Sequence, residues 1–275
     1  MVKINFHQHS TGSDGLLTPE QVVEEAIKSG ITHICFTDHY PLPIGGKERE
    51  SLKGKFEETY VKEVEKLKKE FSGKINIYFG AEFDWLEEYK DWTEKEIKKR
   101  EYDFILGSVH YLPFDDNYLI VPFSETDLKE ACDKFGNYKE IIKEYYKQIR
   151  LMINSGLFDC ASHLDLIKML NKDSVLFSEK EDWYKKEVLE TLDEVKKAGM
   201  CIEINASGWR RLINEQYPSE WILIEAKKRN IPITIGTDGH KFVDTKLEEA
   251  FELARKVGYK SILIFENRKR KEIQI

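Results

Sequence analysis

The sequence predicts an α/β fold in which a parallel sheet closes into a distorted seven-stranded (β/α) barrel. Short apolar segments rich in Ile, Val and Phe alternate with charged amphipathic stretches, which is typical of a parallel sheet covered by helices. The chain has 275 residues, a size at which an α/β barrel forms one domain. No linker, repeat or low-complexity segment divides the chain, so we expect a single domain over residues 1–275.

Seven segments are short and apolar enough to be buried strands. They are residues 2–6, 31–37, 75–79, 104–109, 158–161, 201–204 and 231–235. Seven parallel strands in a chain of this length imply a TIM-like barrel, closed or nearly closed. The tail, residues 261–275, adds an eighth strand-like piece, which either completes the barrel or forms a separate hairpin.

The charged stretches between these segments predict helices. Thr18 is suited to cap the first helix, Pro19 to occupy its first position and Gln21 to complete a capping box, while Gly30 ends it. Further helices are expected over residues 55–71, 138–155, 179–198, 219–229 and 244–257. A glycine lies just after three of these, at Gly156, Gly199 and Gly258.

Composition narrows the classes of function. With 41% hydrophobic and 34% charged residues, the chain has the profile of a soluble globular protein. No apolar run approaches the length of a membrane span, and no signal-like segment is seen, so we expect a cytoplasmic protein without membrane association, in which the four scattered cysteines are reduced. The net charge of −7 disfavours nucleic-acid binding but allows a small anionic substrate. Neither length nor charge specifies an oligomeric state.

Polar side chains gather where the predicted strands end. Active sites of α/β barrels lie at the C-terminal ends of the strands, and residues two apart on a strand point to the same side. Six of the seven histidines fall there, and His33, which lies mid-strand, is expected to be structural. The residues at the strand ends are His7, His9, Asp38, His39, Glu82, His110, His163, Glu203, Asn205, Asp238 and His240.

These residue types predict a metal centre, although a single strand-end histidine is more often only a hydrogen-bonding group. Imidazoles and carboxylates without thiolates suit zinc, manganese, iron or cobalt. The candidates outnumber the ligands of one tetrahedral ion, so two or three divalent ions are expected. Two ions about 3.5–4 Å apart are a standard arrangement for phosphate-ester hydrolysis. For Glu203 the sequence leaves two roles open, an ion pair in the core or a place in the metal site.

The order of these motifs resembles the polymerase and histidinol phosphatase (PHP) family. The shared pattern is His-x-His, Asp-His, Glu, His, His and Asp-x-His, and it spans residues 7–240. Segments 107–110, 163–168, 203–208, 217–219 and 233–240 are similar to the histidinol-phosphate phosphatase branch. The resemblance implies a seven-stranded barrel with up to three ions. It also implies hydrolysis of L-histidinol phosphate to L-histidinol and phosphate, a step of histidine biosynthesis.

The resemblance also implies a ligand for each ion. Asp14 stands where some relatives have His, and Asp is also a competent ligand. The first ion would be held by His7, His9, Glu82 and Asp238, the second by Glu82, His110 and His163, and the third by Asp14 of the Ser13-Asp14 turn, His39 and His240.

The expected mechanism is in-line attack on phosphorus by a hydroxide between the ions, with a basic side chain against the phosphate. Arg210 is favoured for that role because it follows Ser207-Gly208-Trp209, and the alternatives are Lys168 and Arg211. The leaving alkoxide could take a proton from His39, His240, Asp38 or water, unless Asp38 instead orients a ligating histidine. The residues expected to be catalytic are Glu82, Asp238, His39 and His240.

Substrate recognition is expected in the long loops, residues 41–55, 112–126 and 169–178, with Asp115, Asp116 and Glu215 as candidates for the amine and imidazole. The nearest alternative is another PHP phosphoesterase acting on nucleotides or nucleoside bisphosphates. A non-catalytic metal-binding PHP module is a second. An amidohydrolase-like enzyme is a third. Amidohydrolase sites usually use a metal-bridging Lys at a strand end, and only Lys168 comes near one.

Overall fold

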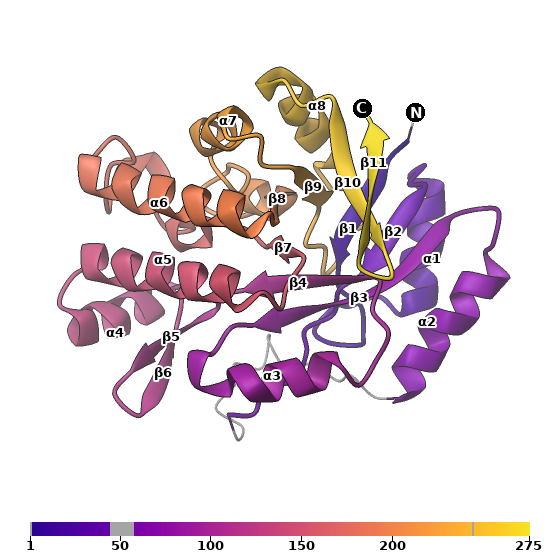
Figure 1. The fold of residues 1–275 in the computed structure, drawn as a ribbon, viewed down its shortest axis with the longest axis horizontal. Helices are drawn as coiled ribbons and strands as arrows, with labels where there is room; N and C mark the ends of the chain where they lie inside the picture. Colours follow the sequence, from indigo (N-terminus) through magenta and orange to yellow (C-terminus); the bar gives the residue numbers. More distant parts are fainter. Residues whose placement is uncertain (1, 45–57, 244) are drawn as a thin grey trace.

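The computed structural model describes residues 2–44, 58–243 and 245–275, and its centre is a sheet of seven parallel strands (Figure 1). Their order in the sheet is β1-β2-β3-β4-β7-β8-β9. The two outer strands approach each other, because the Asp238 amide donates to the His7 carbonyl (2.8 Å) and the His9 amide to the Gly239 carbonyl (3.1 Å). The sheet is therefore a nearly closed barrel, which confirms the predicted fold class. The strands are β1 (Ile4–Gln8), β2 (His33–Phe36), β3 (Asn76–Asp84), β4 (Phe104–Ser108), β7 (Cys160–Ala161), β8 (Cys201–Asn205) and β9 (Ile233–Gly236).

Helices surround the barrel (Figure 1). They are α1 (Pro19–Lys28), α2 (Glu58–Glu70), α3 (Lys90–Ile97), α4 (Glu125–Phe135), α5 (Tyr138–Ser155), α6 (Asp182–Ala198), α7 (Glu220–Lys228) and α8 (Leu247–Val257). The Thr18–Gln21 capping box is present, and Gly156, Gly199 and Gly258 end their helices in the left-handed conformation that glycine favours. Residues 55–57 and 244, which were expected to begin two helices, lie outside the described residues. None of the helices in the described part of the chain is long and apolar enough to cross a bilayer.

Two hairpins lie outside the barrel sheet. β5 (Tyr111–Phe114) and β6 (Asn117–Ile120) pair antiparallel within a stretch that was expected to be a loop. β10 (Ser261–Glu266) and β11 (Lys269–Gln274) form a separate hairpin and do not add an eighth strand to the barrel. This second hairpin packs at the N-terminal ends of the strands. The Phe265 ring lies 4.7 Å from that of Phe104, and the Arg268 guanidinium is 3.0 Å from the Asp159 carboxylate.

The strands are buried on both faces, as expected for a parallel sheet enclosed by helices. Each strand contributes to one continuous hydrophobic cluster, which also includes the inner faces of the helices. Short 3-10 segments in the described connections are η2 (Glu87–Tyr89), η3 (Leu166–Lys168), η4 (Lys172–Ser174) and η5 (Ala206–Arg210). The four cysteines are all free thiols.

Candidate metal centre

The residues at the C-terminal ends of the strands converge on a pocket of about 390 Å³. Imidazoles, carboxylates, two cationic side chains and a few apolar ones form its wall. The lining residues are Asp14, His39, Glu82, His110, Phe123, His163, Leu166, Met169, Ser207, Arg211, Asp238, His240 and Lys241.

Glu82, at the end of β3, lies between two groups of histidines. Its Oε2 is 3.1 Å from His39 Nδ1 and 3.3 Å from His7 Nε2. Its Oε1 accepts a short hydrogen bond from Ser108 and lies 3.1 Å from His163 Nε2. The side chain is 1% exposed, so bulk water cannot satisfy this carboxylate. Because its two oxygens face different histidines, Glu82 has the geometry of a carboxylate that bridges two ions.

On one side of Glu82, the side chains of His7, His9 and Asp238 converge. The Nε2 atoms of His7 and His9 are 3.1 Å apart, and Asp238 Oδ1 is 3.4 Å from His9 Nε2. Ligands at about 2.0–2.2 Å from a tetrahedral ion are themselves about 3.3 Å apart, so these spacings suit one ion. Asp238 adopts a positive φ of 50°, which turns its side chain from the end of β9 toward β1.

On the other side of Glu82 lie His110 and His163, at the ends of β4 and β7. Their Nε2 atoms are 3.2 Å apart. The ligand atoms of Glu82, His110 and His163 all lie within 4.8 Å of one another. This second group therefore also has the dimensions of an ion site.

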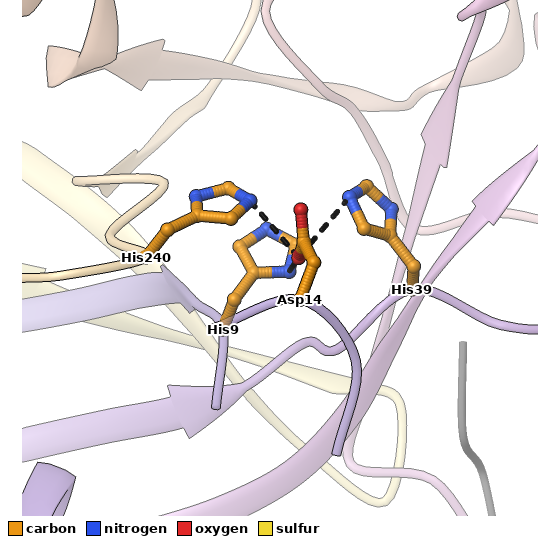
Figure 2. A group of neighbouring side chains, drawn as sticks. All are labelled: His9, Asp14, His39 and His240. Carbon is orange, nitrogen blue, oxygen red and sulfur yellow. Dashed lines mark ion pairs between the residues drawn. The ribbon is translucent and has the colours of Figure 1, made fainter. Parts of the chain in front are cut away.

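A third group comprises His9, Asp14, His39 and His240, which Figure 2 shows around the Asp14 carboxylate. Asp14 Oδ1 is 3.1 Å from His240 Nε2, 3.8 Å from His9 Nδ1 and 3.9 Å from His39 Nε2. The His9 ring stands between the first and third groups, with Nε2 toward Glu82 and Asp238 and Nδ1 toward Asp14. The structure thus brings together all nine residues predicted as metal ligands.

Two buried carboxylates orient the histidines from outside these groups. Glu203 Oε1 is 2.8 Å from His7 Nδ1, and its Oε2 accepts from the His163 amide at 3.0 Å. Asp84 Oδ1 is 2.9 Å from His110 Nδ1. Such carboxylates fix the ring and the tautomer, which leaves the opposite nitrogen to bind a cation. Glu203, left open by the sequence, is therefore part of the site. Asp84 was missed, although it stands two residues after Glu82 on the same face of β3.

Asp38 has a different role from the ligands. Its carboxylate accepts hydrogen bonds from the Ser10 amide (2.7 Å), the Ser13 hydroxyl (2.7 Å) and the Tyr60 hydroxyl (2.5 Å). These contacts hold the turn that carries Asp14. The expectation that Asp38 either protonates the leaving group or orients a histidine is therefore replaced by an anchoring role, since its oxygens are already occupied as acceptors.

Buried charges dominate the electrostatics of the centre. Burial lowers the pKa of His7, but Glu203, Glu82 and Asp238 outweigh it and raise that pKa well above its usual value. Burial also lowers the pKa of His110, but Asp84 and Glu82 outweigh it and raise that pKa to about 9. For His39, burial prevails and lowers the pKa to about 4. The pKa values of Glu82 and Asp238 stay well below their usual range because the histidines outweigh burial.

The donor set fits divalent cations. Ring nitrogens and ionised carboxylates converge without a thiolate, a combination that favours zinc, manganese or iron. Among the residues that the structure describes, the buried Nδ1 of His163 has no hydrogen-bond partner, and the buried Nδ1 of His39 lies 3.1 Å from Glu82 Oε2 without hydrogen-bond geometry. A cluster of facing imidazole nitrogens and buried carboxylates needs a positive charge at its centre, which protons supply in part and metal ions supply in full.

The three basic residues proposed to contact phosphate lie in different places. Arg211 lines the pocket. Arg210 instead donates from Nη2 to the carbonyls of Thr237 (2.7 Å) and Asp238 (2.9 Å). Lys168 is fully buried outside the pocket lining, where its ammonium contacts Asp165 and Glu215. Lys241 lines the pocket and was missed, although it directly follows the Asp-x-His motif.

The loops expected to recognise substrate contribute apolar residues to the pocket. Phe123 and Met169 line it, and so does Leu166 of η3. Asp115 and Asp116 are exposed at the β5–β6 turn, and neither lines the pocket. Residues 45–55 of the first loop lie outside the described residues.

An α/β barrel with buried histidines and carboxylates at the ends of its strands defines a metal-binding barrel of the hydrolase type. A family model described as PHP domain matches residues 5–207. The chain therefore belongs to the PHP family, and the resemblance seen in its motifs is confirmed.

Relatives extend this family match over nearly the whole chain. A probable histidinol-phosphatase of Deinococcus radiodurans is 30% identical over 269 residues, which cover 95% of this chain and 93% of that protein. The histidinol-phosphatase of Bacillus subtilis is 30% identical over 263 residues, with coverages of 89% and 96%. A crystal structure of histidinol phosphate phosphatase from Lactococcus lactis, in complex with zinc, L-histidinol and phosphate, has a TM-score of 0.81 at 25% identity and covers 98% of each chain.

Proposed function

We propose that this protein is a metal-dependent phosphomonoesterase that hydrolyses L-histidinol phosphate to L-histidinol and phosphate in histidine biosynthesis. The observation that carries the proposal is Glu82, buried between two groups of histidines with one oxygen toward each. The relatives named histidinol-phosphatase over nearly their full length support the substrate. We also propose that residues 1–275 act as one domain, consistent with the single large core.

The chain offers ligands for two to three divalent ions, of zinc, manganese or iron. Such ions, when bound, lower the pKa of water and neutralise charge on phosphate oxygens. We assign the first site to His7, His9, Glu82 and Asp238, the second to Glu82, His110 and His163, and the third to Asp14, His39 and His240.

The protein's own residues orient these ligands and the substrate. Glu203 and Asp84 hold the rings of His7 and His110, and Asp38 holds the turn that carries Asp14. Arg211 and Lys241 present positive charge at the pocket wall, where a phosphate would lie. Arg210 supports Asp238 through its backbone carbonyl. With Asp38 occupied and the pKa of His39 lowered to about 4, His240 stays as the protein group able to protonate the leaving alkoxide.

The substrate is a small phosphate monoester rather than a nucleic acid. The net charge of −7 and the small pocket support this assignment. Reduced cysteines, three of them buried, support a cytoplasmic location.

A substrate panel tests the proposal. Protein of measured metal content is incubated with L-histidinol phosphate, a nucleoside monophosphate and a nucleoside 3′,5′-bisphosphate, and phosphate release is followed. We expect fast release from L-histidinol phosphate alone, abolished by a chelator and restored by zinc or manganese. Equal turnover of all three compounds would instead favour a broader phosphoesterase. No turnover by metal-loaded protein would favour a non-catalytic module or a C–N hydrolase.

A further inference from the structure

Lys168 is a buried cation that the metal centre does not use. Among the residues that the structure describes, Lys168 is the one buried lysine, and its side chain is 0% exposed. An unpaired ammonium in such a place is strongly unfavourable, so its partners define its role. Its Nζ lies 3.1 Å from Asp165 Oδ2 and 2.9 Å from Glu215 Oε2, and it donates a short hydrogen bond to the Ser219 hydroxyl.

These partners come from two loops that form different walls of the pocket. Asp165 and Lys168 belong to the turn after β7, whose Leu166 and Met169 line the pocket. Glu215 and Ser219 belong to the connection between β8 and α7, which carries the pocket residues Ser207 and Arg211. Asp165 Oδ2 also accepts from the Ser219 amide at 2.9 Å. The lysine therefore joins the two loops through charged and polar contacts.

Backbone contacts within the second loop connect Glu215 to Arg211. A Cβ on Gly208 would lie 2.0 Å from the Glu215 carbonyl oxygen, so the two backbones are packed directly together. The Arg211 amide donates to the Gly208 carbonyl (3.0 Å), and the Asn214 amide donates to the Arg211 carbonyl (3.0 Å). A shift of Glu215 therefore moves the short segment that presents Arg211 to the pocket.

We propose that Lys168 is a positioning residue: through Glu215 it holds Arg211 at the distance from the metal centre that phosphate binding requires. This inference rests on the proposed phosphatase function, and it replaces direct phosphate contact by Lys168. Small displacements of a positioned charge cost up to about a hundredfold in catalysis, which gives the interaction its importance.

The test is calorimetric titration of the metal-loaded protein with inorganic phosphate. Lys168→Met removes the charge and keeps a similar side-chain length. We expect unchanged metal content, since Lys168 touches none of the proposed ligands, and phosphate affinity weakened on the order of tenfold. With L-histidinol phosphate, KM should rise more than kcat falls. Lys68→Met is the matched control, because Lys68 pairs with Asp103 at the opposite end of the barrel (2.8 Å), and its phosphate affinity should equal that of the wild type.

A double-mutant cycle separates positioning from an independent effect. Arg211→Met should weaken phosphate binding by a similar factor, and adding Lys168→Met to it should change little, because both act through one contact. Additive losses would overturn the proposal, as would wild-type phosphate affinity in Lys168→Met or loss of bound metal from it.

Glu215→Gln provides a second route if Lys168→Met does not fold. Glu215 is 36% exposed at its side chain, so the chain tolerates this change better. We expect weaker phosphate binding with full metal content, and unchanged phosphate affinity would overturn the proposal. If the wild-type protein itself binds no phosphate, the proposed function fails first, which distinguishes the two failures.

Discussion

At the scale of single residues, the centre depends on two buried carboxylates that hold the Nδ1 atoms of its histidines. His7 presents Nε2 to the first site because Glu203 holds its Nδ1. His110 presents Nε2 to the second site because Asp84 holds its Nδ1. Removing such a partner loosens the ring and changes its preferred tautomer. Metal affinity should therefore fall before the stability of the fold does.

The first prediction concerns Glu203→Gln. The amide has nearly the same shape but no charge, so His7 loses the partner that raises its basicity. We expect affinity for the divalent metal to fall about 10–100-fold, with phosphatase activity falling at limiting metal and partly recovering at excess metal. Competition against a metal-binding dye measures the affinity. Glu249→Gln, which changes an exposed carboxylate paired with Lys246, is the control and should bind metal normally.

The second prediction concerns protons in the centre. Burial lowers the pKa of His110, but Asp84 and Glu82 prevail and raise it to about 9. At neutral pH the metal-free ring therefore keeps a proton that an ion must displace. Metal affinity should therefore rise with pH as far as about 9, where His110 loses its proton. Calorimetry in two buffers of different ionisation enthalpy measures the protons released, and a binding heat that is independent of the buffer would contradict this account.

The sequence could predict the role of a residue where its position at the end of a strand sets that role, but not where contacts with a distant loop set it. The histidines proposed as ligands lie at strand ends, so their convergence follows from the barrel alone. Asp84 could have been found from its spacing to Glu82. The roles of Lys168 and Arg210 could not, because each is decided by contacts with a loop more than 25 residues away in the chain. A basic residue near a motif looks the same in sequence whether it faces the pocket or a carboxylate behind it.

At the scale of elements, the site depends on how closely the first and last strands of the sheet approach. Gly236 ends β9, and a Cβ there would lie 2.3 Å from His7 Cβ and 2.2 Å from Glu203 Oε1. Only a residue without a side chain lets β9 close on β1 at this point, which brings Asp238 to His7 and His9.

The third prediction is that Gly236→Ala damages the metal site more than the barrel. One added methyl must push β9 away from His7, and overpacking of this kind typically costs about 1–3 kcal/mol. We expect the variant to fold with a lower melting temperature and to bind less metal than the wild type. Metal analysis after gel filtration measures the outcome, and wild-type metal content with wild-type activity would refute the close approach.

Elements that the sequence did not predict are short or weakly patterned. α3 has eight residues, most of them polar, so it gives no clear period. β7 was predicted over residues 158–161, and only Cys160–Ala161 form a strand in the structure. α4 has a Ser124 cap and ends at Gly136, but its first two residues fall in the loop expected over residues 112–126, and no helix was expected over the rest. The β5–β6 hairpin was missed because its turn, Asp115-Asp116, lacks the glycine that usually marks one.

At the scale of the whole molecule, one end of the barrel carries the chemistry and the other is closed. The β10–β11 hairpin covers the N-terminal ends of the strands, where Arg268 pairs with Asp159 (3.0 Å) and the Asn267 amide donates to Asp103 (3.0 Å). The metal centre lies at the opposite end. Stability and activity should therefore be separable by mutation.

The fourth prediction tests that separation. Arg268→Ala leaves the mostly buried Asp159 without its counter-ion, and we expect a loss of about 1–3 kcal/mol in the free energy of unfolding. The metal content and the KM should stay those of the wild type, because no contact of Arg268 reaches the centre. Urea denaturation and steady-state kinetics give the two readouts. A changed KM would show that the ends of the barrel are coupled.

The sharpest test of metal-dependent hydrolysis is phosphate release from L-histidinol phosphate as a function of the metal bound per chain. Metal-free protein is reconstituted stepwise with zinc or manganese, and the activity and bound metal are measured on the same samples. Since Glu82 joins two of the ligand groups, activity should be nearly absent in the metal-free protein and should appear as the second ion binds. Full activity in chelated protein, or none at full metal loading, would contradict the account.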